Sequence, residues 1–372
     1  MNQTIFKASD NYKELDDYFL SNSYKHIFLV CDAAIKFLKL DSYFADLTKR
    51  LDIEVTRFSD FQPNPLYESV VKGVELFNNS KCDVIVAVGG GSSMDVAKCI
   101  KLYSNMNPNE NYLKQTIVPN KIPFLAVPTT AGTGSEATRY AVIYYEGAKQ
   151  SVTDYSCIPS TVLFDSSALK TLPDYQKKST MLDALCHSIE SFWSVNSNDE
   201  SKEYSKKAIQ MIFSNKDSYL KNEEFGISNM LQAANLAGKA INITQTTAGH
   251  AMCYKITSLY KISHGHAAAL CVNKLWPYMS SNISACIDPR GKEYLEKLFN
   301  MIAEAMGYDS VEDAQIGFSA LLSSLELPKV ENIKEEDFDL LKNSVNPVRL
   351  KNNPVGLTED AINDLYHEIL GR

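Results

Sequence analysis

The first half of the chain alternates short runs of β-branched and other apolar residues with stretches of helical periodicity. We expect strands over residues 26–32, 53–61, 83–91 and 124–130, and helices over 41–51 and 66–80. The run DVIVAVGGG at 83–91 is continuously apolar until its glycines, which is typical of a strand buried on both faces. This alternation of strands and helices predicts a parallel sheet with helices on both faces.

The pattern changes after the segment STVLFDSSALKTLP at 160–173. From Asp174 onward successive segments repeat apolar residues at helical spacing, and we see no convincing strand alternation. We therefore expect an α/β domain over 1–170 and an all-α domain over 171–372.

Composition excludes several classes of protein. Of 372 residues, 45% are hydrophobic and 22% charged, as in an ordinary globular protein, and the net charge is −8. No block of Lys and Arg stands out, so we expect no nucleic-acid partner. No run of 18 apolar residues occurs, so we expect no membrane span.

The start of the chain and its cysteines suggest a compartment. The first residues, MNQTIFKASDNYKELDD, are polar and acidic, unlike a secretory signal. The eight cysteines lie far apart without a CxxC pair, mostly inside apolar runs. Buried thiols in a reducing cytoplasm fit this distribution better than a disulfide framework. The sequence leaves the oligomeric state undecided, with a homodimer as one possibility.

Two glycine-rich loops follow predicted strands. GGGSSMDVAK (89–98) opens a predicted helix, whose free N–H groups and dipole suit a pyrophosphate, although the pattern is neither GxGxxG nor a Walker A loop. The second loop, PTTAGTGSEAT (128–138), is rich in Gly and Thr; its structural alternative is a flexible loop with a helix N-cap at Ser135. Because open parallel sheets bind ligands at the carboxyl ends of their strands, the two loops together indicate a nucleotide site.

Asp32 ends the first predicted strand and has two readings. Its carboxylate could accept hydrogen bonds from the adenosine ribose and repel the 2′-phosphate of NADP. On position alone, a helix N-cap is equally compatible.

Histidine is scarce, and most of the six cluster in two motifs of the helical half. Asp183 and His187 are four residues apart, so a helix places both on one face. His250, His264 and His266 gather within 17 positions. One carboxylate with three neutral imidazoles suits a borderline divalent metal such as Fe²⁺ or Zn²⁺, a Lewis acid able to polarise a carbonyl. Taken singly, each histidine fits a buried structural role better than a ligand role; the clustering of most histidines beside Asp183 favours metal binding.

These motifs, in this order and spacing, resemble the iron-containing (group III) alcohol dehydrogenase family over nearly the whole chain. The resemblance implies a Rossmann-like dinucleotide-binding domain, a helical domain, dehydroquinate synthase-like architecture, and an active site in the cleft between the domains. It also implies a cytoplasmic oxidoreductase that uses NAD, or NADP, and Fe²⁺, or Zn²⁺, to interconvert a small alcohol and aldehyde.

Site residues are carried over from the resemblance by position. The metal ligands would be Asp183, His187, His250 and His264. Asp32 matches an acidic position associated with NAD. The cofactor would contact residues of both loops and a lysine beyond them: Gly89, Gly90, Gly91, Ser92, Ser93, Asp95, Thr129, Thr130, Thr133 and Lys149.

One position departs from the family pattern. Many members carry a histidine four residues after the third ligand, as a proposed proton relay, and this chain has Tyr254 there. Tyrosine is a poorer base at neutral pH, so His266 is the alternative relay, or only orients His264.

A narrower similarity links the chain to phosphonoacetaldehyde reductases, which reduce phosphonoacetaldehyde to 2-hydroxyethylphosphonate. It rests on FSDFQPNP (58–65), SEATRYAVIY (135–144), AGKAINITQTTAGH (237–250) and VNPVRLKNNPVGLT (345–358). A phosphonate dianion needs charge-assisted donors. The candidates are Arg139, Lys239, Asn242, Lys255 and Arg349.

Three alternatives remain open at this stage. The chain could act on uncharged short-chain aldehydes, could be a dehydroquinate synthase-like lyase that uses NAD only transiently, or could be an inactive structural homologue.

Overall fold

The computed structural model describes residues 3–371 and divides the chain into two compact units. The first comprises Met1–Thr130 and Gly134–Leu172, of which residues 1 and 2 are not described. The second comprises Pro173–Arg372, described to residue 371, together with the short loop stretch Ala131–Thr133. Among the described residues, no helix is both long and apolar enough to cross a membrane.

The first unit is built on a six-stranded sheet in the order β1-β8-β5-β4-β2-β3, and every neighbouring pair is parallel. Its strands are β1 (Thr4–Lys7), β2 (His26–Cys31), β3 (Glu54–Phe58), β4 (Val84–Gly89), β5 (Phe124–Pro128) and β8 (Thr161–Phe164). Its helices are α1 (Lys13–Ser21), α2 (Lys39–Ala45), α3 (Leu47–Leu51), α4 (Tyr67–Ser80), α5 (Gly91–Tyr103) and α6 (Ser166–Lys170). Short 3₁₀ turns are η1 (Ala33–Phe37), η2 (Tyr112–Lys114), η3 (Ser135–Ala137) and η4 (Tyr155–Cys157). The predicted parallel sheet is confirmed.

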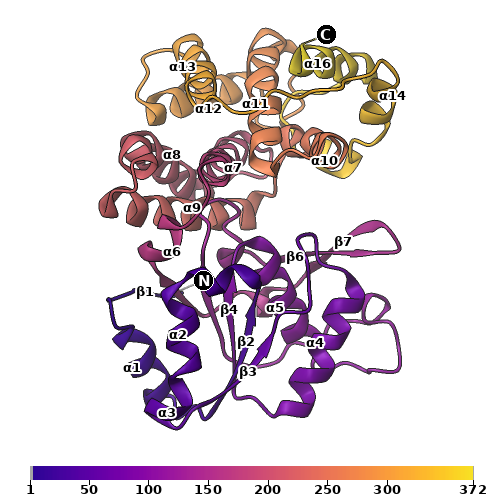
Figure 1. The fold of residues 1–372 in the computed structure, drawn as a ribbon. Coiled ribbons are helices and arrows are strands. Elements are labelled where there is room, and N and C mark those ends of the chain that lie inside the picture. Colours follow the sequence, from indigo (N-terminus) through magenta and orange to yellow (C-terminus); the bar gives the residue numbers. More distant parts are fainter. Residues whose placement is uncertain (1–2, 372) are drawn as a thin grey trace. The chain divides into compact units, whose positions relative to one another are not determined.

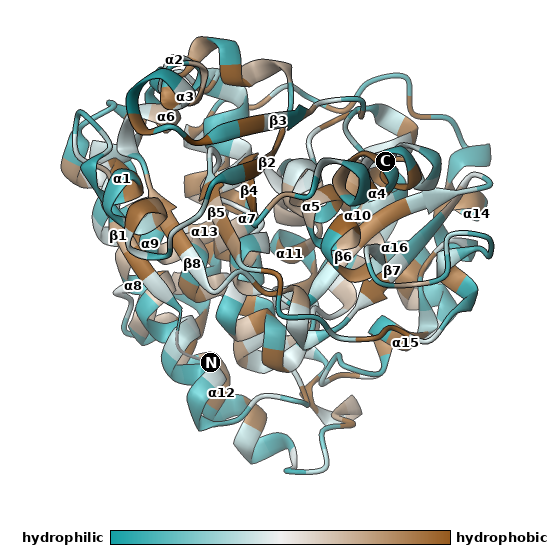
Figure 2. Ribbon diagram, turned by 90° about the horizontal axis from the view of Figure 1, so that it is seen from below, coloured by the Kyte–Doolittle hydropathy of each residue, from teal (hydrophilic) through white to brown (hydrophobic). Residues whose placement is uncertain are grey.

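Both faces of this sheet are covered, as predicted. Successive strand residues point to opposite faces, so Phe28 and Ile85 join one core with α4 and α5, and Leu29 and Val86 join another with α1 and α2. Figure 1 shows α4 and α5 on one side of the strands and α1 and α2 on the other. All six residues of β4 are buried, and the apolar colour along this strand is visible in Figure 2. The continuous apolar run is therefore explained by burial on both sides.

Several predicted boundaries were wrong. The helix expected over 41–51 is interrupted at Asp46 and forms two short helices, α2 and α3. The strand expected over 53–61 ends at Phe58, and the one expected over 83–91 ends at Gly89, because the next helix already begins at Gly91.

An antiparallel hairpin, β6 (Tyr140–Tyr145) and β7 (Ala148–Thr153), was not predicted from the sequence. Its two-residue turn, Glu146 and Gly147, has positive φ at both positions, 50° and 76°. A tight two-residue turn of this kind matches the right-handed twist of the flanking strands. The residue pair Glu-Gly directly after the β-branched and aromatic run YAVIYY was the available signal.

The second unit is helical, and the described residues beyond Pro173 form no named strand. Its longer helices are α7 (Asp174–Trp193), α8 (Asp199–Leu220), α9 (Glu224–Thr244), α10 (Ala248–Tyr260), α11 (His264–Ser281), α12 (Lys292–Met306), α13 (Val311–Ser324) and α16 (Glu359–Leu370). Shorter ones are η5 (Ile283–Ala285), α14 (Glu336–Asn343) and α15 (Pro347–Leu350). Helix α7 packs against α8, α9 and α11, and most of its residues are buried. The candidate metal ligands lie on α7 and on two helices of the same unit.

Candidate functional site

Three helices of the second unit bring the four predicted metal ligands together. Asp183 and His187 lie on α7, His250 lies in the first turn of α10, and His264 is the first residue of α11. The Nε2 atoms of the three histidines lie 3.9, 3.5 and 4.0 Å from Asp183 Oδ1 in chain order. Asp183, His187 and His250 are almost fully buried, whereas the His264 side chain is 36% exposed.

This cluster fits a divalent cation. Ligands about 2.1 Å from a tetrahedrally bound zinc ion stand about 3.4 Å apart, close to the observed separations. Asp183 Oδ1 and His250 Nε2 are buried and make no hydrogen bond within the described part of the chain. An unpartnered buried polar atom is costly, and coordination would satisfy both. The structure thus groups Asp183, His187 and His250 as potential ligands of one metal ion. His264, whose Nε2 lies 4.0 Å from Asp183 Oδ1, stands beside this group as the predicted fourth ligand.

The ionisation of the cluster also suits a cation. Burial alone would raise the pKa of Asp183, but the neighbouring imidazoles, His187 foremost, hold that pKa well below its usual range. Burial lowers the pKa of His187 to about 4, so this imidazole is neutral at pH 7. Burial opposes protonation of His250 too, but the adjacent Glu190 carboxylate outweighs it and raises the pKa of His250 to about 9. The cluster therefore presents an ionised carboxylate, and a cation must displace a proton from His250.

Close approach of the helices depends on a glycine. An added Cβ at Gly265 would lie 2.0 Å from the Ser179 carbonyl oxygen and 2.6 Å from Asp183 Cβ. Only a residue without a side chain lets the first turn of α11 touch α7 here. This contact brings His264 to Asp183.

Tyr254 lies beside the cluster, and His266 is turned to other partners. The Tyr254 ring stacks on His264 with centroids 5.5 Å apart, and burial raises its pKa to about 12, so it stays protonated at neutral pH. His266 is buried, its Nδ1 lies 3.1 Å from the Tyr175 hydroxyl, and burial lowers its pKa to about 4. Residues two apart on a helix do not share a face, so this placement favours Tyr254 over His266 as the residue next to His264.

In the first unit, the two glycine-rich loops meet at the carboxyl ends of β4 and β5, which are neighbouring strands. Helix α5 starts at Gly91, and no side chain caps its first turn. An added Cβ at Gly89 would lie 2.2 Å from Ser93 Oγ, so this turn requires glycine. An uncapped helix start at this edge of a parallel sheet is suited to a phosphate group.

The structure confirms the capping role of Asp32, and the ribose-binding role stays a prediction. Its Oδ1 accepts a hydrogen bond from the Ala34 backbone N–H, which is the N-cap contact of η1. Its Oδ2 lies 3.6 Å from the position of an added Cβ on Gly89. The carboxylate therefore caps a turn and also faces the first glycine-rich loop.

The second loop is held in place by a buried lysine, Lys98, that was not among the predicted site residues. Lys98 is fully buried and its Nζ donates to Ser135 Oγ, Thr138 Oγ1 and the Tyr140 carbonyl at 2.7–3.1 Å. The alternative of an N-cap at Ser135 does not hold, because Gly134 is the N-cap of η3; the Ser135 hydroxyl instead donates to Asp95. A lysine at helical spacing among apolar residues was the available signal.

The remaining cofactor candidates are spread over this unit and one loop stretch of the other. Burial raises the pKa of Asp95 to about 6, against the charges of Lys98 and Lys149. Lys149 is exposed on β7. Gly90, Ser92, Thr129 and Thr130 are half-buried at the sheet edge, and Thr133 belongs to the loop stretch grouped with the helical unit.

Among the substrate candidates, Arg349 acts electrostatically on Tyr254, the ring that stacks on His264. It is half-buried on α15, and its charge works against the raised pKa of Tyr254. Lys255 follows Tyr254 on α10, and Lys239 and Asn242 lie one turn apart on α9, all three half-buried. Arg139 belongs to the first unit, where its guanidinium stacks over the Tyr140 and Tyr155 rings.

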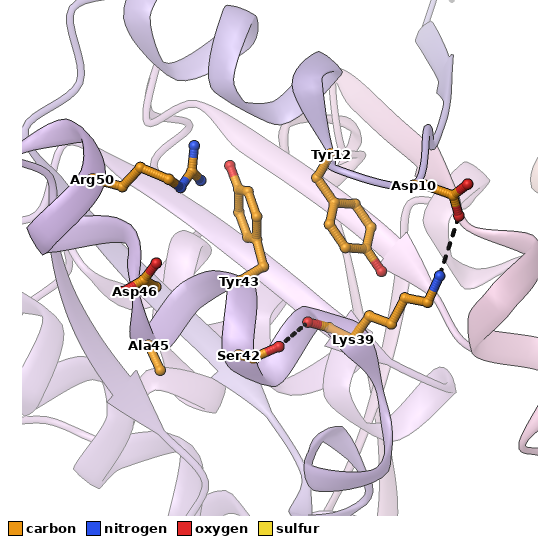
Figure 3. Close-up of a pocket in the computed structure, with 8 residues that line it drawn as sticks. All are labelled: Asp10, Tyr12, Lys39, Ser42, Tyr43, Ala45, Asp46 and Arg50. Atoms are coloured by element: carbon orange, nitrogen blue, oxygen red, sulfur yellow. Dashed lines mark hydrogen bonds and ion pairs between the residues drawn. The ribbon is translucent and has the colours of Figure 1, made fainter.

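A surface pocket of about 600 Å³ in the first unit contains none of these residues. Figure 3 shows Lys39 paired with Asp10 at this pocket. Arg50 is paired with Asp16, which lies outside the pocket lining. We assign it no role.

Comparison with known proteins identifies the family. Residues 2–166 match the iron-containing alcohol dehydrogenase family, and residues 177–370 match the C-terminal domain of the Fe-containing alcohol dehydrogenase family. The chain belongs to the iron-containing alcohol dehydrogenases, a family of oxidoreductases, as its motifs predicted.

Individual relatives are more distant. The chain is 27% identical to alcohol dehydrogenase 4 of Saccharomyces cerevisiae over 94% of its length and 92% of the relative's. It is 27% identical to a phosphonoacetaldehyde reductase of Streptomyces viridochromogenes over 77% of its length and 76% of the relative's. A sulfoacetaldehyde reductase from Bifidobacterium kashiwanohense, solved in complex with NAD⁺, superposes with a TM-score of 0.86 at 26% identity, covering 99% of this chain and 97% of that one.

Proposed function

We propose that this protein reduces phosphonoacetaldehyde to 2-hydroxyethylphosphonate with NAD(P)H, using a divalent cation held by Asp183, His187, His250 and His264. In this reaction the carbonyl carbon gains a hydride and the carbonyl oxygen gains a proton. The cofactor would supply the hydride, and the cation would act as a Lewis acid on the carbonyl oxygen. The convergence of the four ligand side chains is the observation that carries the oxidoreductase assignment.

The Arg349 guanidinium supports an anionic substrate. Its Nη1 donates to Gln245 Oε1 at 2.7 Å, and among the described residues its other two nitrogens have no hydrogen-bond partner. Its positive charge lowers the pKa of Tyr254 against the effect of burial, and the Tyr254 ring stacks on His264. A short aldehyde with its carbonyl at the cluster could thus meet a planar, doubly donating cation at its other end, which suits phosphonate geometry.

The backbone of Gln245 adds to this argument. Gln245 has φ 61° and ψ 176°, a conformation that is strained for any residue other than glycine. Strain of this kind persists where surrounding contacts impose it, and it is concentrated at binding and catalytic sites. Here it presents the side chain that holds Arg349.

Two relatives favour the same substrate class. The names phosphonoacetaldehyde reductase and sulfoacetaldehyde reductase both denote enzymes for aldehydes with an anionic acid group. For the cofactor, the uncapped start of α5 supports binding of a dinucleotide pyrophosphate, and the Asp32 carboxylate supports NAD in preference to NADP.

Steady-state kinetics test the substrate assignment. After anaerobic reconstitution with Fe²⁺ or Zn²⁺, we expect kcat/KM for phosphonoacetaldehyde to exceed the values for acetaldehyde, butyraldehyde and lactaldehyde. Arg349→Met should lower kcat/KM for phosphonoacetaldehyde by about 10- to 100-fold, since a hydrogen bond to a charged group contributes about 1.5–3 kcal/mol. The loss on acetaldehyde should be much smaller.

The matched control is Lys351→Met, which removes an exposed charge two residues away. It should leave the preference unchanged. Equal kcat/KM values for charged and uncharged aldehydes would contradict phosphonoacetaldehyde as the substrate and favour a general activity on short-chain aldehydes. Absence of net NADH turnover with every aldehyde would favour a lyase or an inactive homologue.

A further inference from the structure

Glu190 is a buried acid that lies outside the predicted ligand set. It sits on α7, one turn beyond His187, and its side chain is fully buried. Ionised carboxylates are rarely found in this environment unless several donors compensate them. Its partners therefore indicate what it does.

Four hydrogen bonds converge on this carboxylate, all from the first turn of α10. Oε1 accepts from the Thr247 backbone N–H at 3.2 Å, the Thr247 hydroxyl at 2.6 Å and the His250 backbone N–H at 3.2 Å. Oε2 pairs with His250 Nδ1. Since no side chain of its own caps α10, Glu190 satisfies the free N–H groups at this helix start.

The surroundings hold the carboxylate in this place. Trp193 Nε1 donates to Thr247 Oγ1 at 2.9 Å, so the hydroxyl is fixed from its other side. An added Cβ at Gly249 would lie 2.9 Å from Glu190 Oε1, so glycine is needed for α10 to approach. The contact between Glu190 and His250 is built into the packing of α7 against α10.

We propose that Glu190 is a positioning residue for the metal centre: by accepting a hydrogen bond from His250 Nδ1–H, it turns Nε2 of that ring toward Asp183 Oδ1 and keeps this nitrogen as the one that binds the cation. The His250 Nε2 atom is buried, lies 3.5 Å from Asp183 Oδ1 and has no hydrogen-bond partner among the described residues. A carboxylate on the far nitrogen of a ligating imidazole fixes its tautomer and increases its basicity. This inference rests on the proposed metal site.

Glu190→Gln is the most informative variant, because it keeps the shape of the side chain and reverses the direction of the hydrogen bond to His250 Nδ1. Three donors converge on Oε1, so the amide oxygen should take that position and the NH₂ group should face His250 Nδ1. Nδ1 must then accept, which leaves the imidazole proton on Nε2, where the cation would bind. We expect the Kd for Zn²⁺ or Co²⁺ to rise about 10- to 100-fold, with an altered visible spectrum of the Co²⁺ protein.

Two further variants separate positioning from packing. Thr247→Val removes the hydroxyl donor and the Trp193 contact but keeps the carboxylate on His250, so metal-free stability should fall while the Kd changes less than about threefold. Glu190→Asp keeps the charge and should recover part of the affinity lost in Glu190→Gln. Metal-free unfolding in denaturant, measured for each variant, reports the packing contribution.

The proposal is overturned if Glu190→Gln binds the metal as tightly as the unmodified protein, or if Thr247→Val weakens binding equally. If Glu190→Gln does not fold, the protonation of His250 Nδ1 is measured directly in ¹⁵N spectra of the unmodified, metal-free protein labelled at histidine. The His250 signals are assigned as those that disappear in His250→Gln. Nδ1 of His250 must carry a proton, and a bare Nδ1 contradicts the proposal. Failure of the unmodified protein to bind metal would instead refute the proposed function.

Discussion

The predicted metal site on α7, α10 and α11 and the glycine-rich edge of the sheet use different parts of the polypeptide. At the metal site, side chains from three helices converge on Asp183 Oδ1 within 4.0 Å. At the sheet edge, the uncapped backbone at the start of α5 and glycines without side chains offer the binding features. A site made of side chains depends on the chemistry of each residue. A site made of backbone depends on whether the neighbouring side chains leave its N–H groups uncapped and accessible to a ligand.

The largest effect is expected from removing a predicted ligand. His264→Ala should abolish metal retention and turnover together, because one of the four imidazole and carboxylate donors is lost. Metal content by atomic spectroscopy and NADH-linked activity measure both. NAD(H) binding to the first unit should persist, and an active, metal-free variant would refute the site.

A smaller effect is expected where the helices of the metal site touch. Gly265→Ala places a Cβ 2.0 Å from the Ser179 carbonyl oxygen. Overpacking of this kind destabilises by about 1–3 kcal/mol, and the shift of α11 should weaken metal binding as well. Denaturant unfolding and metal titration measure the two effects.

Gly356→Ala is the matched control, since its Cβ would meet Ile287 at an ordinary 3.4 Å. It should change the free energy of unfolding by less than about 0.5 kcal/mol. If both alanines were equally harmless, the close approach of α11 to α7 would not be required.

The smallest effect is expected at the sheet edge. Asp32→Asn keeps an oxygen that can cap η1 and removes the charge that faces Gly89. The preference for NADH over NADPH, as the ratio of kcat/KM values, should fall about tenfold, while metal content stays unchanged. An unchanged ratio would leave Asp32 with its capping role alone.

The ligand cluster illustrates how far sequence reasoning reaches. The spacing of Asp183 and His187 places both on one helix face, and the scarcity of histidine drew attention to His250 and His264. Periodicity likewise predicted the parallel sheet and the all-α second half, because burial patterns repeat along the chain. The hairpin β6–β7 was missed although its Glu-Gly turn was readable.

The chain alone thus determined which residues have the chemistry of a metal ligand and which segments are helices or strands. Only the tertiary structure decided which side chains meet. Glu190 and Lys98 have their partners 57–60 and 37–42 residues away, on other elements, and nothing local marks those pairs. The same packing turned His266 to Tyr175 and set Tyr254 on His264, because helix contacts, rather than sequence spacing, determine where a ring points.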